Sequence, residues 1–189
     1  MRASRPGESA LLLLDAIEVL DGARVDYAVI GALAASVHGA IRASMDADVL
    51  LLAGMRVAGD LERSFAAAGY DAELTQGDQA DPIPGLLRIR DAFENRVDLL
   101  IGLRGMDPAA FARGIVVPFR GAHLNFIGRE DFIAMKVFAG GPLDLLDAAR
   151  ALSAGGTSVD LSLVRRLAGG FGKDAERALE RLLADASGI

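Results

Sequence analysis

Two spacings of hydrophobic residues alternate along this chain of 189 residues. Between Glu8 and Leu20 the apolar positions recur about one helical turn apart with acidic residues between them, which predicts an amphipathic helix. Short apolar runs bounded by glycine, proline and aspartate follow, and these are typical of strands and turns. The chain therefore begins with a helix and continues into a region rich in strands.

The first two-thirds of the chain alternates predicted strands and helices. Strands are expected at residues 25–30, 46–52, 70–74, 86–90, 97–101, 115–119 and 123–127. Helices are expected at residues 32–37, 55–68 and 108–113, with a loop at 75–85. From Arg129 onward the pattern is helical and is interrupted by paired glycines. The predicted fold class is α/β (α+β), in which residues 1–128 form a mixed β-sheet core flanked by helices and residues 129–189 form a C-terminal helical bundle.

Composition and charge narrow the function classes. The sequence has no cysteine, which excludes disulfides and thiol catalysis and agrees with a reducing cytoplasm. No apolar run has the length of a membrane span or the form of a signal peptide, so we expect a cytoplasmic protein. The net charge is −6, and nucleic-acid binding would therefore need a local basic patch. Basic residues do gather near the C-terminus among acids, as either a solvated face or an RNA contact: Arg165, Arg166, Lys173, Arg177 and Arg181.

Candidate chemistry lies in an Asp-x-Asp pair on the second predicted strand. Asp46 and Asp48 are two residues apart, so on a strand both carboxylates point to the same face. Apolar residues follow them, which places the acids at one end of a buried strand. Magnesium takes hard oxygen ligands of this kind. Most Asp-x-Asp pairs are solvated strand ends or turns, so the pair needs support from elsewhere in the sequence.

A third acid provides that support. Asp98 is the one polar position in the apolar run 97–101, and a buried acid needs a partner such as a shared metal. Two metal ions held by three carboxylates would act as a clamp on an in-line displacement, and Asp98 would also help to deprotonate an attacking hydroxyl.

These features together resemble the nucleotidyltransferase superfamily with a DNA polymerase β-like core, and most closely its AbiEii-like members, the toxins of toxin–antitoxin pairs. That group has a glycine pair after the first strand and then an Arg-x-Thr-x-Asp-x-Asp segment. Here the corresponding residues are Gly31-Ala32 and residues 42–48, in which Arg42 is kept and Ser44 replaces threonine. The resemblance implies that Asp46, Asp48 and Asp98 bind Mg²⁺ and that the Gly31 turn lies against the nucleotide phosphates. Because Ala32 replaces the second glycine or a serine, one phosphate contact is lost or left to the backbone.

Residues 131–147 extend the resemblance. The family has a helix with a lysine, a break, and two acids three residues apart on the next helix; here these are Lys136, Asp144 and Asp147. The resemblance implies that Lys136 contacts the triphosphate and that Asp144 or Asp147 orients it or assists catalysis. A structural salt bridge between the two helices is the alternative for the acids. Arg42 similarly either holds a phosphate or pairs with nearby acids.

The function expected from the sequence is transfer of a nucleoside monophosphate from an NTP to a hydroxyl, with Mg²⁺ as the cofactor. The resemblance implies a tRNA 3′ end as the acceptor and an antitoxin protein as a partner. Two alternatives stay open: a small-molecule nucleotidyltransferase, and an inactive binding module that keeps the fold. His38 and His123 are interpreted as structural residues.

Overall fold

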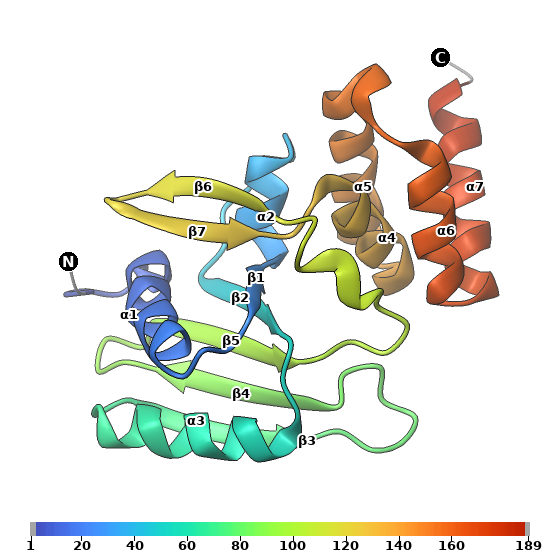
Figure 1. Cartoon of the computed structure of the whole chain (residues 1–189). Helices are drawn as coiled ribbons and strands as arrows, with labels where there is room; N and C mark the ends of the chain where they lie inside the picture. Colours follow the sequence, from blue (N-terminus) through green and yellow to red (C-terminus); the bar gives the residue numbers. More distant parts are fainter. Residues whose placement is uncertain (1–2, 188–189) are drawn as a thin grey trace. The chain divides into compact units, whose positions relative to one another are not determined.

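A computed structural model describes residues 3–187 and contains one seven-stranded sheet within them (Figure 1). The ends of the predicted domain ranges, residues 1–2 and 188–189, lie outside this description. The strand order is β3-β4-β5-β2-β1-β7-β6. The strands are β1 (Tyr27–Val29), β2 (Asp46–Leu51), β3 (Asp71–Gln76), β4 (Gly85–Arg90), β5 (Arg96–Ile101), β6 (Ile115–Phe119) and β7 (Ala122–Phe126).

Parallel and antiparallel pairs are combined in this sheet. The pairs β2–β5 and β1–β7 are parallel, whereas β1–β2, β3–β4 and β4–β5 are antiparallel. The helices are α1 (Ser9–Gly22), α2 (Gly31–Val37), α3 (Met55–Ala67), α4 (Arg129–Ala139), α5 (Pro142–Gly155), α6 (Leu161–Gly170) and α7 (Lys173–Ser187), with short 3₁₀ turns at Pro108–Ala110 and Gly156–Ser158. This mixed sheet with flanking helices confirms the predicted fold class.

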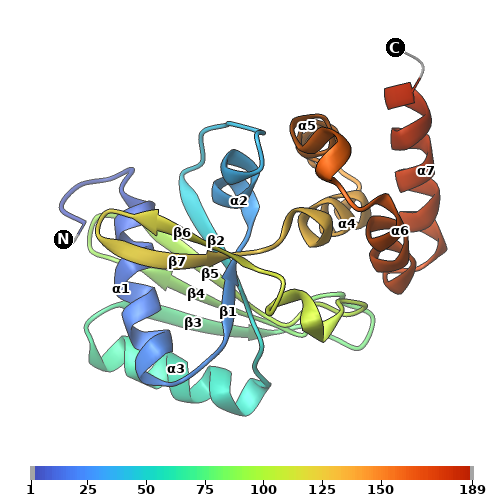
Figure 2. The same ribbon diagram turned by 45° about the horizontal axis from the view of Figure 1, so that its top comes forward.

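Helices α1 and α3 cover the apolar face of the sheet (Figures 1 and 2). Helix α3 buries Ala58, Leu61 and Phe65, which recur at helical spacing on one side. Strands β4 and β5 bury Leu87 and Leu99 completely at alternating positions. The other set of alternating positions holds charged residues at Arg88, Arg90, Arg96 and Asp98 and apolar ones at Leu86 and Leu100. The second face of the sheet is therefore polar over part of its length.

The described residues fall into two compact units. The sheet unit contains the chain up to Leu33, Ala43–Arg104 and Val116–Phe126. The helical unit contains Ala34–Arg42, Gly105–Ile115 and the chain from Ile127 onward. In the helical unit α4 packs against α5, α6 and α7, and it buries Phe132 and Ile133 almost completely. No helix among residues 3–187 is long and apolar enough to cross a membrane.

Several element boundaries differ from the sequence prediction, and the helix expected at residues 108–113 is only a 3₁₀ turn at Pro108–Ala110. The loop expected to begin at Thr75 begins later, because Thr75 and Gln76 pair with Leu86 and Gly85 of the neighbouring strand. Long-range pairing of this kind overrides the local turn signal of the glycines and prolines that follow.

Candidate active site

Charged side chains form two rows across the polar face of four neighbouring strands. The strand registers place Glu73, Arg88, Asp98 and Asp48 in the first row and Asp71, Arg90, Arg96 and Asp46 in the second. Residues paired in register point to the same face of a sheet. Acidic and basic side chains therefore lie side by side, and their charges compensate one another.

Asp98 is the most enclosed acid of these rows, with only 9% of its surface exposed. Arg88 of β4 donates a hydrogen bond from Nε to Asp98 Oδ1 at 3.1 Å. The Nε of Arg96 lies 3.5 Å from the same oxygen. The charge of Asp98, a single acid in an apolar strand, is thus balanced by arginines on the same face of the sheet.

Asp46 stands at the start of β2 and is held by two groups. Ser44 donates a hydrogen bond from Oγ to Asp46 Oδ1 at 2.6 Å, and the Arg96 guanidinium contacts Oδ2. The hydrogen bond from Ser44 and the neighbouring Arg96 lower the pKa of Asp46. In this structure the hydroxyl of Ser44 therefore stabilises the charged carboxylate of Asp46 through a hydrogen bond.

Asp48 lies against the glycine turn that opens α2. Gly31 has φ +61°, and a Cβ built there would overlap the Asp48 carboxylate. The backbone N–H of Ile30 donates to the carbonyl oxygen of Asp48 at 2.9 Å. Ala32, the next residue of the turn, is almost fully buried. Glycine is thus required at position 31 for two local reasons, its positive φ and the space that Asp48 occupies.

Four of the other predicted site residues come together in the helical unit. Lys136 Nζ of α4 lies 2.6 Å from Asp144 Oδ1 and 3.2 Å from Asp147 Oδ2, both on α5. Arg42 Nε lies 3.2 Å from the same Asp147 oxygen. Asp147 is fully buried, and its second oxygen has no hydrogen-bond partner among the described residues. Lys136 and Arg42 are therefore engaged by carboxylates, which is the structural alternative that the sequence left open for these acids.

His38 has a structural environment in the same unit. The residue is 2% exposed, its Nε2 lies 2.8 Å from the carbonyl oxygen of Ile127, and its ring packs against Phe132. Burial lowers the pKa of His38 and favours the neutral ring. In the neutral ring Nε2 carries the hydrogen and donates a hydrogen bond to the carbonyl oxygen of Ile127.

Arg88 and Arg96 are the site residues that the sequence reasoning missed. Both sit two residues from another charged position on a strand, in Arg88-x-Arg90 and Arg96-x-Asp98. This alternation is the signal that would have placed them on the polar face. Their pairing with particular acids depends on the register between strands.

By their chemistry the three carboxylates suit a divalent cation, which takes hard oxygen ligands. Asp48 lies directly opposite Asp98, and Asp46 is on the same face two residues earlier. Within residues 3–187, however, no three His, Asp or Glu side chains are grouped so that they could hold a metal ion as they lie. The oxygens of Asp46 and Asp98 are directed to arginines instead.

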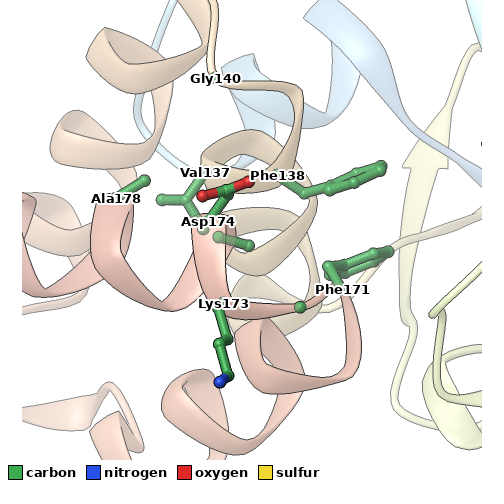
Figure 3. A pocket seen from close by; sticks show the side chains of 9 residues that line it. Val137, Phe138, Gly140, Phe171, Lys173, Asp174 and Ala178 are labelled. Carbon is green, nitrogen blue, oxygen red and sulfur yellow. The ribbon is translucent and has the colours of Figure 1, made fainter.

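Each unit also contains a cavity. In the sheet unit, one of ≈270 Å³ is bounded by Asp46 and Arg96 together with Arg90 and Glu94. In the helical unit, one of ≈410 Å³ lies beside the stacked rings of Phe138 and Phe171, whose centroids are 4.6 Å apart (Figure 3). Lys173 borders this second cavity but points away from the two rings (Figure 3). The cavity beside Asp46 is the one that adjoins candidate chemistry.

No protein-family model matches the sequence, and no curated protein matches it either. Solved structures match in fold. The solution structure of the antibiotic-resistance factor ANT(2'')-Ia has a TM-score of 0.59 at 13% identity, over 93% of this chain and 95% of that chain. An antigenic nucleotidyltransferase-like protein from Paracoccidioides brasiliensis has a TM-score of 0.56 at 14% identity, over 98% and 92% of the two chains.

A third similar structure is the lincosamide antibiotic adenylyltransferase LnuA with lincomycin bound. Its TM-score is 0.51 at 11% identity, over 80% of this chain and 99% of that chain. The match thus extends over most of each protein compared. The chain has the nucleotidyltransferase fold.

Proposed function

We propose that this protein is a nucleotidyltransferase that moves a nucleoside monophosphate from an NTP to a hydroxyl acceptor. The observation that carries the proposal is the β2–β5 register, because it sets three carboxylates on one face of the sheet. The fold supports it, since LnuA, which is named an adenylyltransferase, shares that fold. Fold alone does not define a reaction, and the carboxylates are therefore the part to test.

The residues have distinct roles in this proposal. Asp46, Asp48 and Asp98 would hold Mg²⁺, and two ions bound there would neutralise phosphate charge and polarise the reacting oxygens. Asp98 accepts the proton of the acceptor hydroxyl, and Arg88 fixes the orientation of its carboxylate. The acceptor oxygen bonds to the α-phosphorus, the bond from that phosphorus to the bridging oxygen breaks, and pyrophosphate leaves.

The expected phosphate contacts of Gly31, Ala32, Arg42 and Lys136 stay proposals. Lys136 is bound to Asp144 and Asp147, so a contact with phosphate requires it to release one of these carboxylates. The same holds for Arg42, whose Nε lies beside Asp147. Each of these side chains has a carboxylate partner that a phosphate would have to replace.

The proposed acceptor is the hydroxyl of a small molecule. ANT(2'')-Ia is named an antibiotic-resistance factor and LnuA a lincosamide antibiotic adenylyltransferase. The basic residues near the C-terminus are a poor RNA surface, because Arg165 pairs with Glu180, Arg166 with Asp107 and Arg177 with Asp174. The net charge of −6 also gives no general attraction for nucleic acid.

A tRNA 3′ end, an antitoxin partner and a toxin role follow from the sequence resemblance alone. Transfer to a tRNA 3′ end belongs to the same reaction class, and the test below includes tRNA as an acceptor. A cytoplasmic location remains an expectation from the sequence.

The test is transfer of label from each radiolabelled NTP with Mg²⁺, using total tRNA and a panel of aminoglycosides and lincosamides as acceptors. Asp46→Asn removes one proposed metal ligand. Asp71→Asn is the matched control, because it makes the same change on the same face of the sheet and Asp71 pairs with Arg90 at the edge strand.

Label transferred by the wild type and by Asp71→Asn but not by Asp46→Asn supports the proposal and identifies the acceptor. Unchanged turnover in Asp46→Asn overturns the assignment of the carboxylates. Binding of NTP with Mg²⁺ without transfer to any acceptor favours the inactive binding module.

A further inference from the structure

Arg96 occupies the space between two of the proposed metal ligands. It lies opposite Asp46 in the β2–β5 register and two residues before Asp98 on its own strand. Its guanidinium contacts Asp46 Oδ2, and its Nε lies 3.5 Å from Asp98 Oδ1. One positive charge therefore faces two carboxylates that a divalent cation would need.

The contact of Arg96 with Asp98 is incompletely formed, although Arg96 donates a hydrogen bond to Asp46. Its Nε is buried and makes no hydrogen bond, although it is within ion-pair distance of Asp98. Arg113 offers a contrast, because its Nε and Nη2 both donate to Asp131, at 2.8 and 2.7 Å. A fork that satisfies both oxygens is a stable arrangement, whereas a guanidinium with a buried N–H left unbonded loses free energy.

Arg96 also has room to leave. Its side chain is 38% exposed, and it borders the cavity of ≈270 Å³ together with Asp46. A guanidinium that moves into this cavity would exchange its contact with Asp46 for water. The cost of that movement is small, because ion pairs near the surface are weak.

We propose that Arg96 is an internal counter-ion that competes with a divalent cation for the carboxylates of Asp46 and Asp98. The inference rests on the proposed function, since it assumes that these acids hold the metal. Cation binding then requires the guanidinium to withdraw, and the positive charge of Arg96 sets a limit on metal affinity. Arg96 is a positioning residue in this account and takes no part in bond making.

The test measures Mn²⁺ binding directly, by electron paramagnetic resonance of the free ion and by calorimetry, without a nucleotide. Arg96→Gln removes the positive charge, and Arg96→Lys keeps the charge but loses the planar guanidinium group. Arg90→Gln is the matched control: Arg90 lies beside Arg96 in the register, has a similar exposure of 34%, and pairs with Asp71. Circular dichroism and melting curves show which variants are folded.

We expect Arg96→Gln to bind Mn²⁺ about tenfold more tightly than the wild type, because removing a unit charge within a few ångströms strengthens cation binding. Arg96→Lys should gain about threefold, and it serves as the test if the glutamine variant does not fold. Arg90→Gln should stay within about twofold of the wild type, because Arg90 has its own carboxylate partner.

Equal or weaker Mn²⁺ binding by the folded Arg96 variants would overturn the inference, as would an equal gain in Arg90→Gln. An absence of Mn²⁺ binding in both wild type and Arg96→Gln would overturn it too. The proposed function is decided separately by label transfer: a wild type that transfers label only with Mg²⁺ keeps that function even if Arg96 proves irrelevant.

Discussion

Asp48 and Asp98 lie directly opposite each other on the parallel strands β2 and β5, with Arg88 next to Asp98 in the same row. Two carboxylates in register repel each other, and the sheet can accept them only if a positive charge is near. Arg88 supplies that charge from the third strand of the row. The row therefore couples the stability of the sheet to the acids that we assign to catalysis.

The pair of Arg88 and Asp98 should be coupled in stability. Asp98→Asn and Arg88→Gln should each lower the free energy of unfolding by about 1–2 kcal/mol, because each removes the nearer partner of a partly buried charge. The double variant should lose about 1 kcal/mol less than the sum of the two single losses. Urea denaturation of the four proteins measures this, and strict additivity would show that the pair contributes nothing.

Gly31→Ala should destabilise the protein more than an ordinary glycine substitution at positive φ. Gly102→Ala is the matched control, because Gly102 has φ +80° and open space around it, so it reports backbone strain alone. We expect about 1 kcal/mol for Gly102→Ala and about 3 kcal/mol for Gly31→Ala, in which the overlap with Asp48 is added to the strain.

A second substitution separates the backbone strain at Gly31 from the overlap with Asp48. In an Asp48→Ala background the cost of Gly31→Ala should fall toward that of Gly102→Ala, because the carboxylate that the new Cβ overlaps is gone and only the Cβ of residue 48, 3.0 Å away, remains. Equal losses for Gly31→Ala and Gly102→Ala in the wild-type background would show that Asp48 moves away freely. Thermal or urea unfolding gives both comparisons.

The sequence allowed the acids to be placed but not their partners. Asp46 and Asp48 could be set on one face because side-chain direction alternates along a strand, and this rule is local. Arg88 and Arg96 could not be assigned to Asp98 and Asp46, because that assignment depends on which strands pair and in which register. Register is decided by the packing of the whole sheet.

The role of Gly31 could likewise be predicted from the sequence only in part. The sequence showed a glycine between a strand and a helix, and a turn with positive φ is a local property that can be inferred from it. That the glycine leaves space for Asp48 depends on the neighbouring strand β2, which lies beside it only after folding. The prediction that the turn contacts phosphate stays a prediction.

Lys136→Met should destabilise the helical unit. The ammonium lies between Asp144 and Asp147, and its removal leaves the fully buried Asp147 with Arg42 as its ion-pair partner. We expect a loss of about 2 kcal/mol, smaller than for a buried acid that loses every partner. Lys173→Met is the control, since Lys173 is exposed, and it should change stability by less than about 0.5 kcal/mol. If Lys136 contributes only to phosphate binding and not to stability, the two variants will melt at the same temperature.

His38 should make the protein less stable as the pH falls below about 6.5, the pKa of an unperturbed histidine. Burial lowers its pKa in the folded state, so the unfolded chain binds the proton more readily and protonation favours unfolding. The loss begins near pH 6.5 and continues until the pH reaches the lowered pKa of His38 in the folded protein, with a slope of at most about 1.4 kcal/mol per pH unit.

His38→Gln keeps an N–H that can donate to Ile127 but does not titrate, so its free energy of unfolding should fall less over this range. Urea denaturation of both proteins between about pH 7.5 and pH 5, the range in which histidine titrates, measures the difference. Parallel curves would mean that another group controls stability at these pH values, because the substitution removes the titration of His38 alone.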